Sequence, residues 1–294
     1  MIEARVGVVG IGAMGEPMVM AIARAGFEVT ACAHRNRAPL ERLAAHGVRQ
    51  ASDPAAVAAS SDVVITMLPD APQVEEAIFS ERGLLAGAEK LTYFIDMSTI
   101  SPLASRQFSL RLTAAGHRFV DAPVSGGPSR AKDGTLTLMV GAETADFSHL
   151  APVLRAMGVP HHVGPVGTGE TVKLVNQLLI ANIMIANAEA LSFAKQSGAD
   201  VEIVREVIAS ATGSNYILEK WLPNTWFSGS FEGGFALDLL RKDVAAALDV
   251  ARIMVLPLPA SSLAYQLYTA ASAQGNGARD YSAIAALYEH LAAQ

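Results

Sequence analysis

The chain has 294 residues, of which 51% are hydrophobic and 17% charged, and it carries a net charge of −6 from 22 Lys and Arg against 28 Asp and Glu. The small charged fraction and large apolar fraction exclude a disordered chain, and the length favours two domains. Because the basic residues are scattered, the sequence offers no surface for nucleic acid or an anionic membrane. Small-molecule partners are therefore expected.

The single cysteine, Cys32, excludes an internal disulfide and a cysteine-rich metal site, which favours a reducing compartment. The N-terminus carries Glu3 and enters an apolar run that ends in glycines, unlike a secretory or mitochondrial presequence. The longest uncharged stretch, 253–278, is interrupted by Pro257 and Pro259 and is too polar for a membrane helix. We expect a cytoplasmic protein without a membrane span.

The first half of the chain alternates short apolar runs with alanine-rich helical periodicity. Strands are predicted at 6–9, 28–33, 63–67, 93–96, 118–121, 136–140 and 161–163, and helical segments include 17–24 and 40–45. This rhythm of strand, helix and strand is typical of βαβ units, so it predicts a mostly parallel, doubly wound sheet.

The pattern changes at 169–196, where no turn signal occurs and apolar residues lie all round a predicted helix. Such a helix would be ~40 Å long and must be buried by other helices or by a partner chain. The remainder reads as helix, including 201–210, 237–256, 259–273 and 284–293. We predict an α/β domain over 1–164, an all-α substrate and dimerisation domain over 165–294, and a long helix between the two.

A glycine-rich motif directly follows the first strand. Its residues are Gly10, Ile11, Gly12, Ala13, Met14 and Gly15, a G-x-G-x-x-G sequence. Because it lies between a strand and a helical pattern, the motif predicts a Rossmann dinucleotide site rather than an empty glycine turn. Gly10 would permit the tight turn, Gly12 would admit the pyrophosphate, and Gly15 would allow close helix packing. The pyrophosphate would then lie at a helix N-terminus.

The end of the second strand bears on the choice of cofactor. NAD-selective sites usually carry an acid there, about 20 residues after the glycine loop, but this chain has His34, Arg35, Asn36 and Arg37. Arg35, with Arg37 or His34, can form charge-assisted bonds to a 2′-phosphate. NADP is therefore the preferred cofactor and NAD a possible one. The alternative is a solvated basic turn.

Three further motifs extend the pattern along the chain. They are Asp-Ala-Pro-Val-Ser-Gly-Gly at 121–127, Gly-Thr-Gly-Glu-Thr-Val-Lys-Leu-Val-Asn-Gln at 167–177, and Phe235 followed by Lys242-Asp243. With the glycine loop, these ordered motifs make the whole chain similar to the β-hydroxyacid dehydrogenase family, which includes 3-hydroxyisobutyrate dehydrogenases and tartronate semialdehyde (2-hydroxy-3-oxopropionate) reductases. The resemblance implies a Rossmann domain followed by an all-helical domain.

The resemblance also implies roles for individual residues. Lys173 would be the catalytic lysine. Ser125, Gly126 and Gly127 would form the loop that binds the substrate carboxylate. The residues themselves add Asn176, Gln177, Phe235 and Asp243 as candidates for substrate binding. For the cofactor, Leu68 and Pro69 would line the adenosine side, Thr99 would lie near the nicotinamide, and Lys242 would reach the cofactor from the helical domain. These residues join the candidates already taken from the glycine loop and the basic turn, which are Gly10, Ile11, Gly12, Ala13, Met14, Gly15, His34, Arg35 and Asn36.

Three departures from the family pattern qualify this assignment. Gln177 stands where many relatives have Asn and resembles the tartronate semialdehyde reductases. The turn at 33–37 is longer than the common Asn-Arg-Thr ending, which leaves the phosphate ligand open. The sequence at 239–241 is Leu-Leu-Arg and not the His-containing version of the glycerate-forming relatives, so their substrate is not implied.

Hydride transfer to a carbonyl generates an alkoxide, which needs a proton donor. Lys173 suits this role, since burial in an apolar helix would lower its pKa towards neutrality. Gln177 lies one turn further on the same face and could hold the substrate or the lysine. The alternative for Lys173 is an ordinary i,i+3 salt bridge with Glu170.

The Ser125 hydroxyl and the amides of Gly126 and Gly127 can converge on an anion, so the substrate should carry a carboxylate. The segment 123–128 could instead be a plain loop. Phe235 either covers the nicotinamide or fills the core, and Asp243 either holds Lys242 or contacts the substrate.

These observations predict an NADP-preferring enzyme that interconverts a short 3-hydroxy carboxylate and its semialdehyde, with Lys173 as general acid and base. The alternatives are an imine reductase of the same architecture, which usually lacks the lysine, and a cofactor-binding assembly module without turnover. His161 and His162 have no acidic partner at metal-ligand spacing, so no metal is expected. The long apolar helix predicts a homodimer or homotetramer.

Overall fold

The structure is a computed structural model that describes residues 4–34, 36–232 and 234–292, with side chains described as far as Tyr288. The chain divides into two compact units, Met1–Lys173 and Leu174–Gln294. Arg35, one of the predicted phosphate ligands, lies outside the described residues.

Within the described part of unit one, nine strands form a single sheet. They are β1 (Arg5–Val9), β2 (Glu28–Cys32), β3 (Arg49–Gln50), β4 (Val63–Thr66), β5 (Tyr93–Asp96), β6 (Arg118–Asp121), β7 (Val124–Ser125), β8 (Leu136–Gly141) and β9 (Gly158–Gly164). The strand order is β3-β2-β1-β4-β5-β6-β8-β7, and β9 pairs with β8. Strands β1 to β6 pair in parallel, whereas β8 runs antiparallel to β6 and β7. The predicted Rossmann sheet is confirmed.

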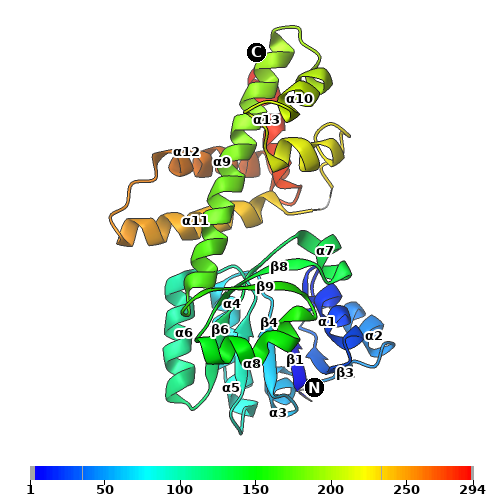
Figure 1. The fold of residues 1–294 in the computed structure, drawn as a ribbon, viewed down its shortest axis with the longest axis vertical. Coiled ribbons are helices and arrows are strands. Elements are labelled where there is room, and N and C mark those ends of the chain that lie inside the picture. The colour runs from blue at the N-terminus through cyan, green and yellow to red at the C-terminus, as the bar shows by residue number, and fades with distance from the viewer. Residues whose placement is uncertain (1–3, 35, 233, 293–294) are drawn as a thin grey trace. The chain divides into compact units, whose positions relative to one another are not determined.

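The helices of unit one cover both faces of this sheet (Figure 1). They are α1 (Gly15–Arg24), α2 (Ala38–Ala44), α3 (Pro54–Ala59), α4 (Ala71–Phe79), α5 (Leu84–Gly87), α6 (Pro102–Ala114), α7 (Gly127–Asp133) and α8 (Thr144–Arg155). Successive residues of β4 point to opposite faces: Val63 and Ile65 join one apolar cluster and Val64 joins the other. The continuous apolar strands are explained by this burial on two sides.

The strand order reverses between β1 and β4, because the chain moves outward to β2 and β3 and then returns to β4. In open α/β sheets the ligand crevice lies outside the carboxyl ends of the strands at this switch point. The glycine motif, which follows β1, is therefore placed at the crevice.

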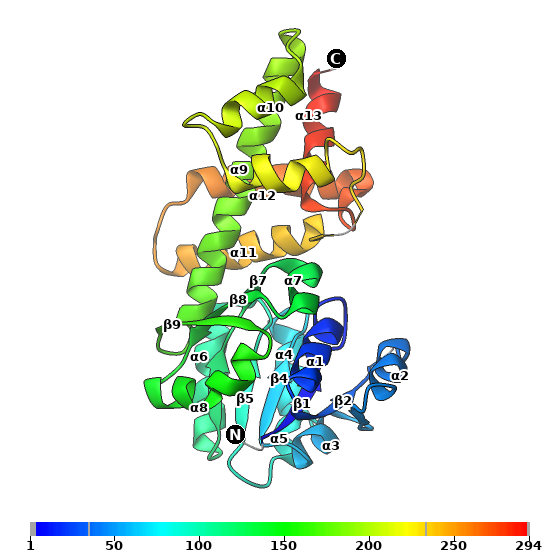
Figure 2. The same cartoon turned by 45° about the vertical axis from the view of Figure 1, so that its right-hand side comes forward.

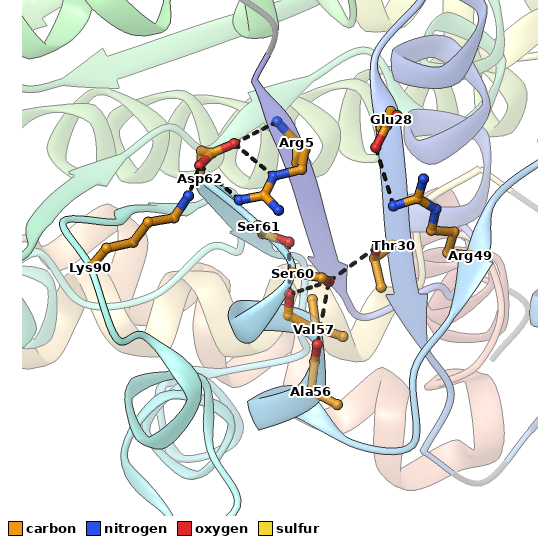
Figure 3. A network of polar contacts seen from close by, with 10 residues as sticks. All are labelled: Arg5, Glu28, Thr30, Arg49, Ala56, Val57, Ser60, Ser61, Asp62 and Lys90. Atoms are coloured by element: carbon orange, nitrogen blue, oxygen red, sulfur yellow. Dashed lines mark hydrogen bonds and ion pairs between the residues drawn. The ribbon is translucent and has the colours of Figure 1, made fainter.

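An ionic cluster joins β1 and β4 at their amino-terminal ends, opposite the ligand crevice (Figure 3). Asp62, just before β4, accepts hydrogen bonds from the Arg5 backbone nitrogen at 3.0 Å and from Arg5 Nε at 3.2 Å, and it pairs with Lys90. The hydrogen bond from the Arg5 side chain holds the pKa of Asp62 well below its usual range. Since Arg5 opens β1, the cluster ties β1 and β4 together away from the ligand crevice.

Unit two is helical apart from its connections. Helix α9 (Thr168–Gln196) begins in unit one and continues into unit two. It is followed by α10 (Val201–Ala209), a π-helical turn (Ile217–Trp221), a 3-10 turn (Leu222–Asn224), α11 (Leu237–Ile253), α12 (Pro259–Ala271), a second π-helical turn (Ser272–Asn276), a second 3-10 turn (Tyr281–Ala283) and α13 (Ile284–Ala292). In Figure 2, α9 is flanked by α11, α12 and α13.

By length and composition, α9 could cross a membrane, although 44% of its apolar window is buried inside the protein. Its Ala181, Met184 and Leu191 share one apolar cluster with Val244 of α11 and Tyr268 of α12. These contacts are those of a core helix in a folded unit, and core helices of this kind satisfy the same hydropathy test.

The seven predicted strands are confirmed, with small differences at their ends, and the short strands β3 and β7 were not predicted. Helix was predicted for the remainder of the chain after 196, and this is wrong at 211–215, 225–232 and 234–236, which are not helical. Gly213, Gly229 and Gly234 lie in these connections, and glycine favours turns there. The predicted helix 237–256 ends earlier, at Ile253. The domain boundary at 164/165 remains a prediction.

Candidate active site

The three glycines of the loop after β1 have different surroundings. Gly10 has φ +100°, and a Cβ there would overlap the Met67 carbonyl oxygen at the end of β4. A Cβ on Gly15 would overlap the Gly10 carbonyl oxygen, whereas one on Gly12 would have no atom within 4 Å. Gly10 and Gly15 therefore allow β1, β4 and α1 to approach closely, and Gly12 borders open space. A dinucleotide pyrophosphate fits this cradle, because α1 begins at Gly15, directly after the loop, and a helix N-terminus favours an anion.

The loops after β4 and β5 are joined by a buried hydrogen-bond network. Asp96, at the end of β5, accepts from Thr66 Oγ1 at 2.8 Å and from Ser98 Oγ at 2.6 Å. Ser98 Oγ in turn accepts from the Leu68 backbone nitrogen at 2.9 Å. The network therefore fixes the loop that carries Leu68 and Pro69 beside the loop that carries Thr99. Thr99 and Leu68 are half-buried and Pro69 is exposed.

Asp121, at the end of β6, acts as a distant cap for α9. Its Oδ1 accepts from the Gly167 nitrogen at 2.7 Å and its Oδ2 from the Glu170 nitrogen at 2.8 Å. Burial raises the pKa of Asp121 to about 6, against the opposing effect of these hydrogen bonds. The first turn of α9 is thereby attached to the carboxyl edge of the sheet, a role that sequence reasoning missed.

The structure brings Lys173 to the predicted carboxylate loop, inside unit one. Lys173 is 8% exposed, and its Nζ donates a hydrogen bond of 2.9 Å to the Val124 carbonyl oxygen. Val124 immediately precedes Ser125 in β7, so the amine lies at the strand that carries the loop. The segment is not a plain loop, because Val124 and Ser125 form β7, and α7 starts at Gly127.

Gly126 and Gly127 have φ values of +135° and +68°, which favour glycine over any residue with a side chain. The structure therefore explains why two glycines follow Ser125. All three residues are half-buried, so the Ser125 hydroxyl and the loop backbone are partly accessible.

Glu170 is fully buried, and its Oε2 accepts from the Ile100 nitrogen at 3.2 Å. The carboxylate named as the alternative salt-bridge partner of Lys173 thus accepts a hydrogen bond from the loop after β5. No short sequence signal marks this contact, since the two residues are 70 positions apart.

In unit two, four predicted site residues form one polar chain. Gln177 is buried, and its Nε2 donates to Asp243 Oδ2 at 2.7 Å, while its Oε1 accepts from Asn176 Nδ2 at 3.0 Å. The Lys242 Nζ lies 2.8 Å from Asp243 Oδ1. The predicted contact between Asp243 and Lys242 is therefore present. The hydrogen bond from Gln177 to Asp243 also joins α9 to α11.

Phe235 is half-buried in the core of unit two, with its ring 6.3 Å from that of Tyr281. Its backbone nitrogen donates to Asp280 Oδ2 at 3.1 Å, and Asp280 also accepts from Trp221 Nε1 at 3.0 Å. Phe235 therefore packs in the core, as one of its two predicted roles requires. Asp280, which holds this segment in place, was not predicted.

The predicted 2′-phosphate turn is exposed at His34, Asn36 and Arg37. Asn36 Oδ1 accepts from the Ala38 nitrogen at 3.1 Å at the start of α2. Arg42 of α2 forms a two-pronged pair with Glu16 of α1, with both distances 2.7 Å. This pair, which the sequence did not indicate, anchors the helix after the basic turn to the helix after the glycine loop.

Other reactive residue types offer no rival centre among the described residues. Cys32 is buried, and burial raises the pKa of its thiol to about 11. His162 bonds to the Ala142 carbonyl oxygen at 2.8 Å and stacks on Phe147. In the part of the chain that the structure describes, no three His, Cys, Asp or Glu residues gather as metal ligands.

Comparison with known proteins identifies the family. Residues 5–167 match the model of the NAD binding domain of 6-phosphogluconate dehydrogenase, and residues 167–288 match the NAD-binding domain of NADP-dependent 3-hydroxyisobutyrate dehydrogenase. The chain is 36% identical to 2-(hydroxymethyl)glutarate dehydrogenase of Eubacterium barkeri, over 98% of this chain and 95% of that one. It is 34% identical to 2-hydroxy-3-oxopropionate reductase of Escherichia coli, over 98% of each chain.

Among solved structures, 3-hydroxyisobutyrate dehydrogenase of Mycobacterium tuberculosis with L-serine matches with a TM-score of 0.90 and 31% identity, covering 97% of this chain and 99% of that one. An imine reductase from Myxococcus stipitatus has a TM-score of 0.67 at 16% identity over 98% and 99% of the two chains, a likeness of fold alone. The chain therefore belongs to the β-hydroxyacid dehydrogenase family and is an NAD(P)-dependent oxidoreductase that acts on the CH–OH group of hydroxy acids.

Proposed function

We propose that Lys173 is the general acid and base of a reaction that interconverts a short 3-hydroxy carboxylate and its semialdehyde. The observation that carries the proposal is the position of Lys173 Nζ, buried and 2.9 Å from the carbonyl oxygen of Val124, directly before Ser125. The amine is therefore bonded to the residue that directly precedes Ser125, where the loop suited to a carboxylate begins.

The nicotinamide, when bound, supplies or accepts the hydride. In reduction, the Lys173 ammonium donates a proton to the oxygen on which negative charge develops; in oxidation, the neutral amine accepts that proton. The Ser125 hydroxyl and the amides of Gly126 and Gly127 hold the substrate carboxylate. The buried surroundings of Lys173 strengthen its interaction with the developing charge, because little water screens it.

The remaining assignments follow the family resemblance. Asn176, Gln177, Phe235 and Asp243 are proposed to contribute to substrate binding, and Lys242 to cofactor binding. The hydrogen bonds of Gln177 support a restrained orientation for its amide, since Nε2 is directed to Asp243 and Oε1 to Asn176. For a hydrogen bond to the substrate, Gln177 therefore has only the second N–H of its Nε2 and the second lone pair of its Oε1.

NADP is the proposed cofactor in preference to NAD. His34 and Arg37 are exposed at the end of β2, and no carboxylate occupies positions 34 to 37 to repel a 2′-phosphate. The hydrogen bond from the Ala38 nitrogen to Asn36 Oδ1 fixes the start of α2, directly after the exposed Arg37. We further propose that the protein is cytoplasmic and forms a homodimer or homotetramer.

The test is the kinetics of NADPH and NADH oxidation with a panel of short semialdehydes, in the wild type and in Lys173→Ala. We expect kcat/KM to fall by about 10²–10⁴-fold in the variant, as for loss of a general acid. Lys132→Ala, which removes an exposed lysine of α7, should leave the rate unchanged.

Equal rates in the wild type and in Lys173→Ala would refute the role of Lys173. Reduction of cyclic imines but of no semialdehyde would support the imine reductase alternative. Binding of NADPH without turnover of any substrate in the wild type would support the non-catalytic alternative.

A further inference from the structure

A second buried charge lies one helical turn before Lys173. Glu170 is fully buried in the first turn of α9, and Lys173 is 8% exposed in the next. Side chains three residues apart lie on the same face of a helix, with about 5–6 Å between their Cβ atoms. The acid and the amine therefore share one buried environment inside unit one.

Glu170 is held in place through both its side chain and its backbone. Its side-chain Oε2 accepts a hydrogen bond of 3.2 Å from the backbone nitrogen of Ile100, the residue that follows Thr99. Its own backbone nitrogen donates to Asp121 Oδ2 at 2.8 Å, which attaches the same turn to β6. Glu170 is thus a bridge between the loop proposed to contact the nicotinamide and the helix that carries the amine.

Burial by itself favours the neutral form of a lysine. An opposite charge within about 4–6 Å favours the charged form and moves a pKa by about 1–3 units. Among the other charged groups of unit one, Asp121 on β6 accepts from the Glu170 nitrogen, and burial, together with the charge of Asp96 on β5, raises the pKa of Asp121. Arg130 on α7 is engaged with the Thr135 carbonyl oxygen. One turn after Lys173, Gln177 is bonded to Asp243, whose charge is matched by Lys242.

We propose that Glu170 is a positioning residue that keeps Lys173 protonated in its buried site and holds its helical turn against the Thr99 loop. The inference rests on the proposed function, in which the ammonium form of Lys173 donates the proton during reduction. In the proposed site, Glu170 itself contacts neither substrate nor cofactor. It acts through the charge and the orientation of its neighbour.

The decisive variant is Glu170→Gln. A glutamine oxygen can still accept from the Ile100 nitrogen, so the bridge is retained while the charge is removed. In reduction, kcat/KM falls at high pH because Lys173 loses its proton. In the variant, the midpoint of this alkaline limb of the pH profile should move to lower pH by about one pH unit or more. Glu143→Gln removes the same charge from an exposed position of unit one and should leave the limb in place.

A second measurement follows Lys173 in the cofactor-free protein, by NMR titration of ¹³C-labelled lysine with the Lys173 signal assigned from Lys173→Ala. The midpoint should fall in Glu170→Gln by the same amount as the kinetic limb. Glu170→Asp keeps the charge, so its midpoint should lie between those of the wild type and Glu170→Gln. If Glu170→Gln does not fold, this shorter acid still tests the proposal, since it too should lower the midpoint.

An unchanged midpoint and an unchanged alkaline limb in Glu170→Gln would overturn the inference while leaving the proposed function intact, provided that Lys173→Ala is inactive. Full activity in Lys173→Ala would instead overturn the proposed function. A lowered midpoint in the cofactor-free protein would still support the electrostatic role of Glu170.

Discussion

At the scale of single residues, substitutions at Gly12 and Gly15 should distinguish a loss of cofactor binding from a loss of folding stability. A Cβ at Gly12 would meet no protein atom within 4 Å, whereas one at Gly15 would overlap the Gly10 carbonyl oxygen. We predict that Gly12→Ala keeps its thermal stability but binds NADPH at least about tenfold more weakly, a change of ~1.4 kcal/mol, because the methyl group occupies space needed by the pyrophosphate. Fluorescence titration with NADPH measures the affinity.

Gly15→Ala is the matched comparison. It should lose about 1–3 kcal/mol of unfolding free energy, since α1 must move away from the end of β1 to accommodate the methyl group. Urea denaturation of both variants checks this difference. Wild-type affinity for NADPH in Gly12→Ala would contradict the placement of the pyrophosphate at this glycine.

The residues that sequence reasoning missed share a physical property. Asp96, Asp121 and the Glu170 carboxylate are joined to partners that are distant along the chain, such as Gly167 for Asp121 and Ile100 for Glu170. A local motif identifies a residue by its neighbours in sequence, and it therefore located Lys173, Ser125 and the glycine loop. Long-range hydrogen bonds appear only once the strands are arranged in a sheet.

At the scale of secondary-structure elements, the end of α11 is an unusual C-cap. The Val255 nitrogen donates to the Arg252 carbonyl oxygen at 3.2 Å and the Leu256 nitrogen to that of Ala251 at 2.9 Å, the two bonds of a Schellman motif. The left-handed position of this motif normally holds glycine, but Val255 occupies it with φ +56° and is 88% exposed. A β-branched side chain is strained there.

We predict that Val255→Gly stabilises the protein by about 0.5–1 kcal/mol. Relief of the left-handed strain contributes roughly 1–2 kcal/mol, and the greater chain entropy of glycine in the unfolded state offsets about half of it. Met254→Gly is the control: Met254 has φ −79°, so it should lose stability. Thermal denaturation of the wild type, Val255→Gly and Met254→Gly measures their order of stability. A loss of stability in Val255→Gly would show that Val255 is not strained.

The same C-cap explains why the helix was predicted to extend to 256. Glycine is the residue that usually marks a helix end in sequence, and Val255 removes that signal while the apolar periodicity continues. Elsewhere the periodicity was sufficient: the strands of the Rossmann sheet and the long helix α9 were predicted with ends within a few residues. Short elements such as β3 and β7 have two residues each, too few to show a period.

At the scale of the whole molecule, the order of motifs was enough to predict the family and the two-part architecture, since each motif belongs to a known place in a βαβ unit or on a helix. The assembly is different, because it depends on surfaces rather than on periodicity. The surface of unit two carries Phe193 of α9, 75% exposed, and Ile203 and Val207 of α10, about 60% exposed. In addition, α10 contains no buried residue in the single chain.

Apolar residues gathered on neighbouring elements commonly mark a protein interface. We therefore predict that light scattering at micromolar concentration gives a dimer or a tetramer, and that the double variant Phe193→Ser with Val207→Ser shifts the protein towards monomer. Leu110→Ser is the control, because Leu110 is similarly exposed but lies on α6 of unit one. A monomeric wild type would refute the predicted assembly, and an unchanged oligomer in the double variant would place the interface on another surface.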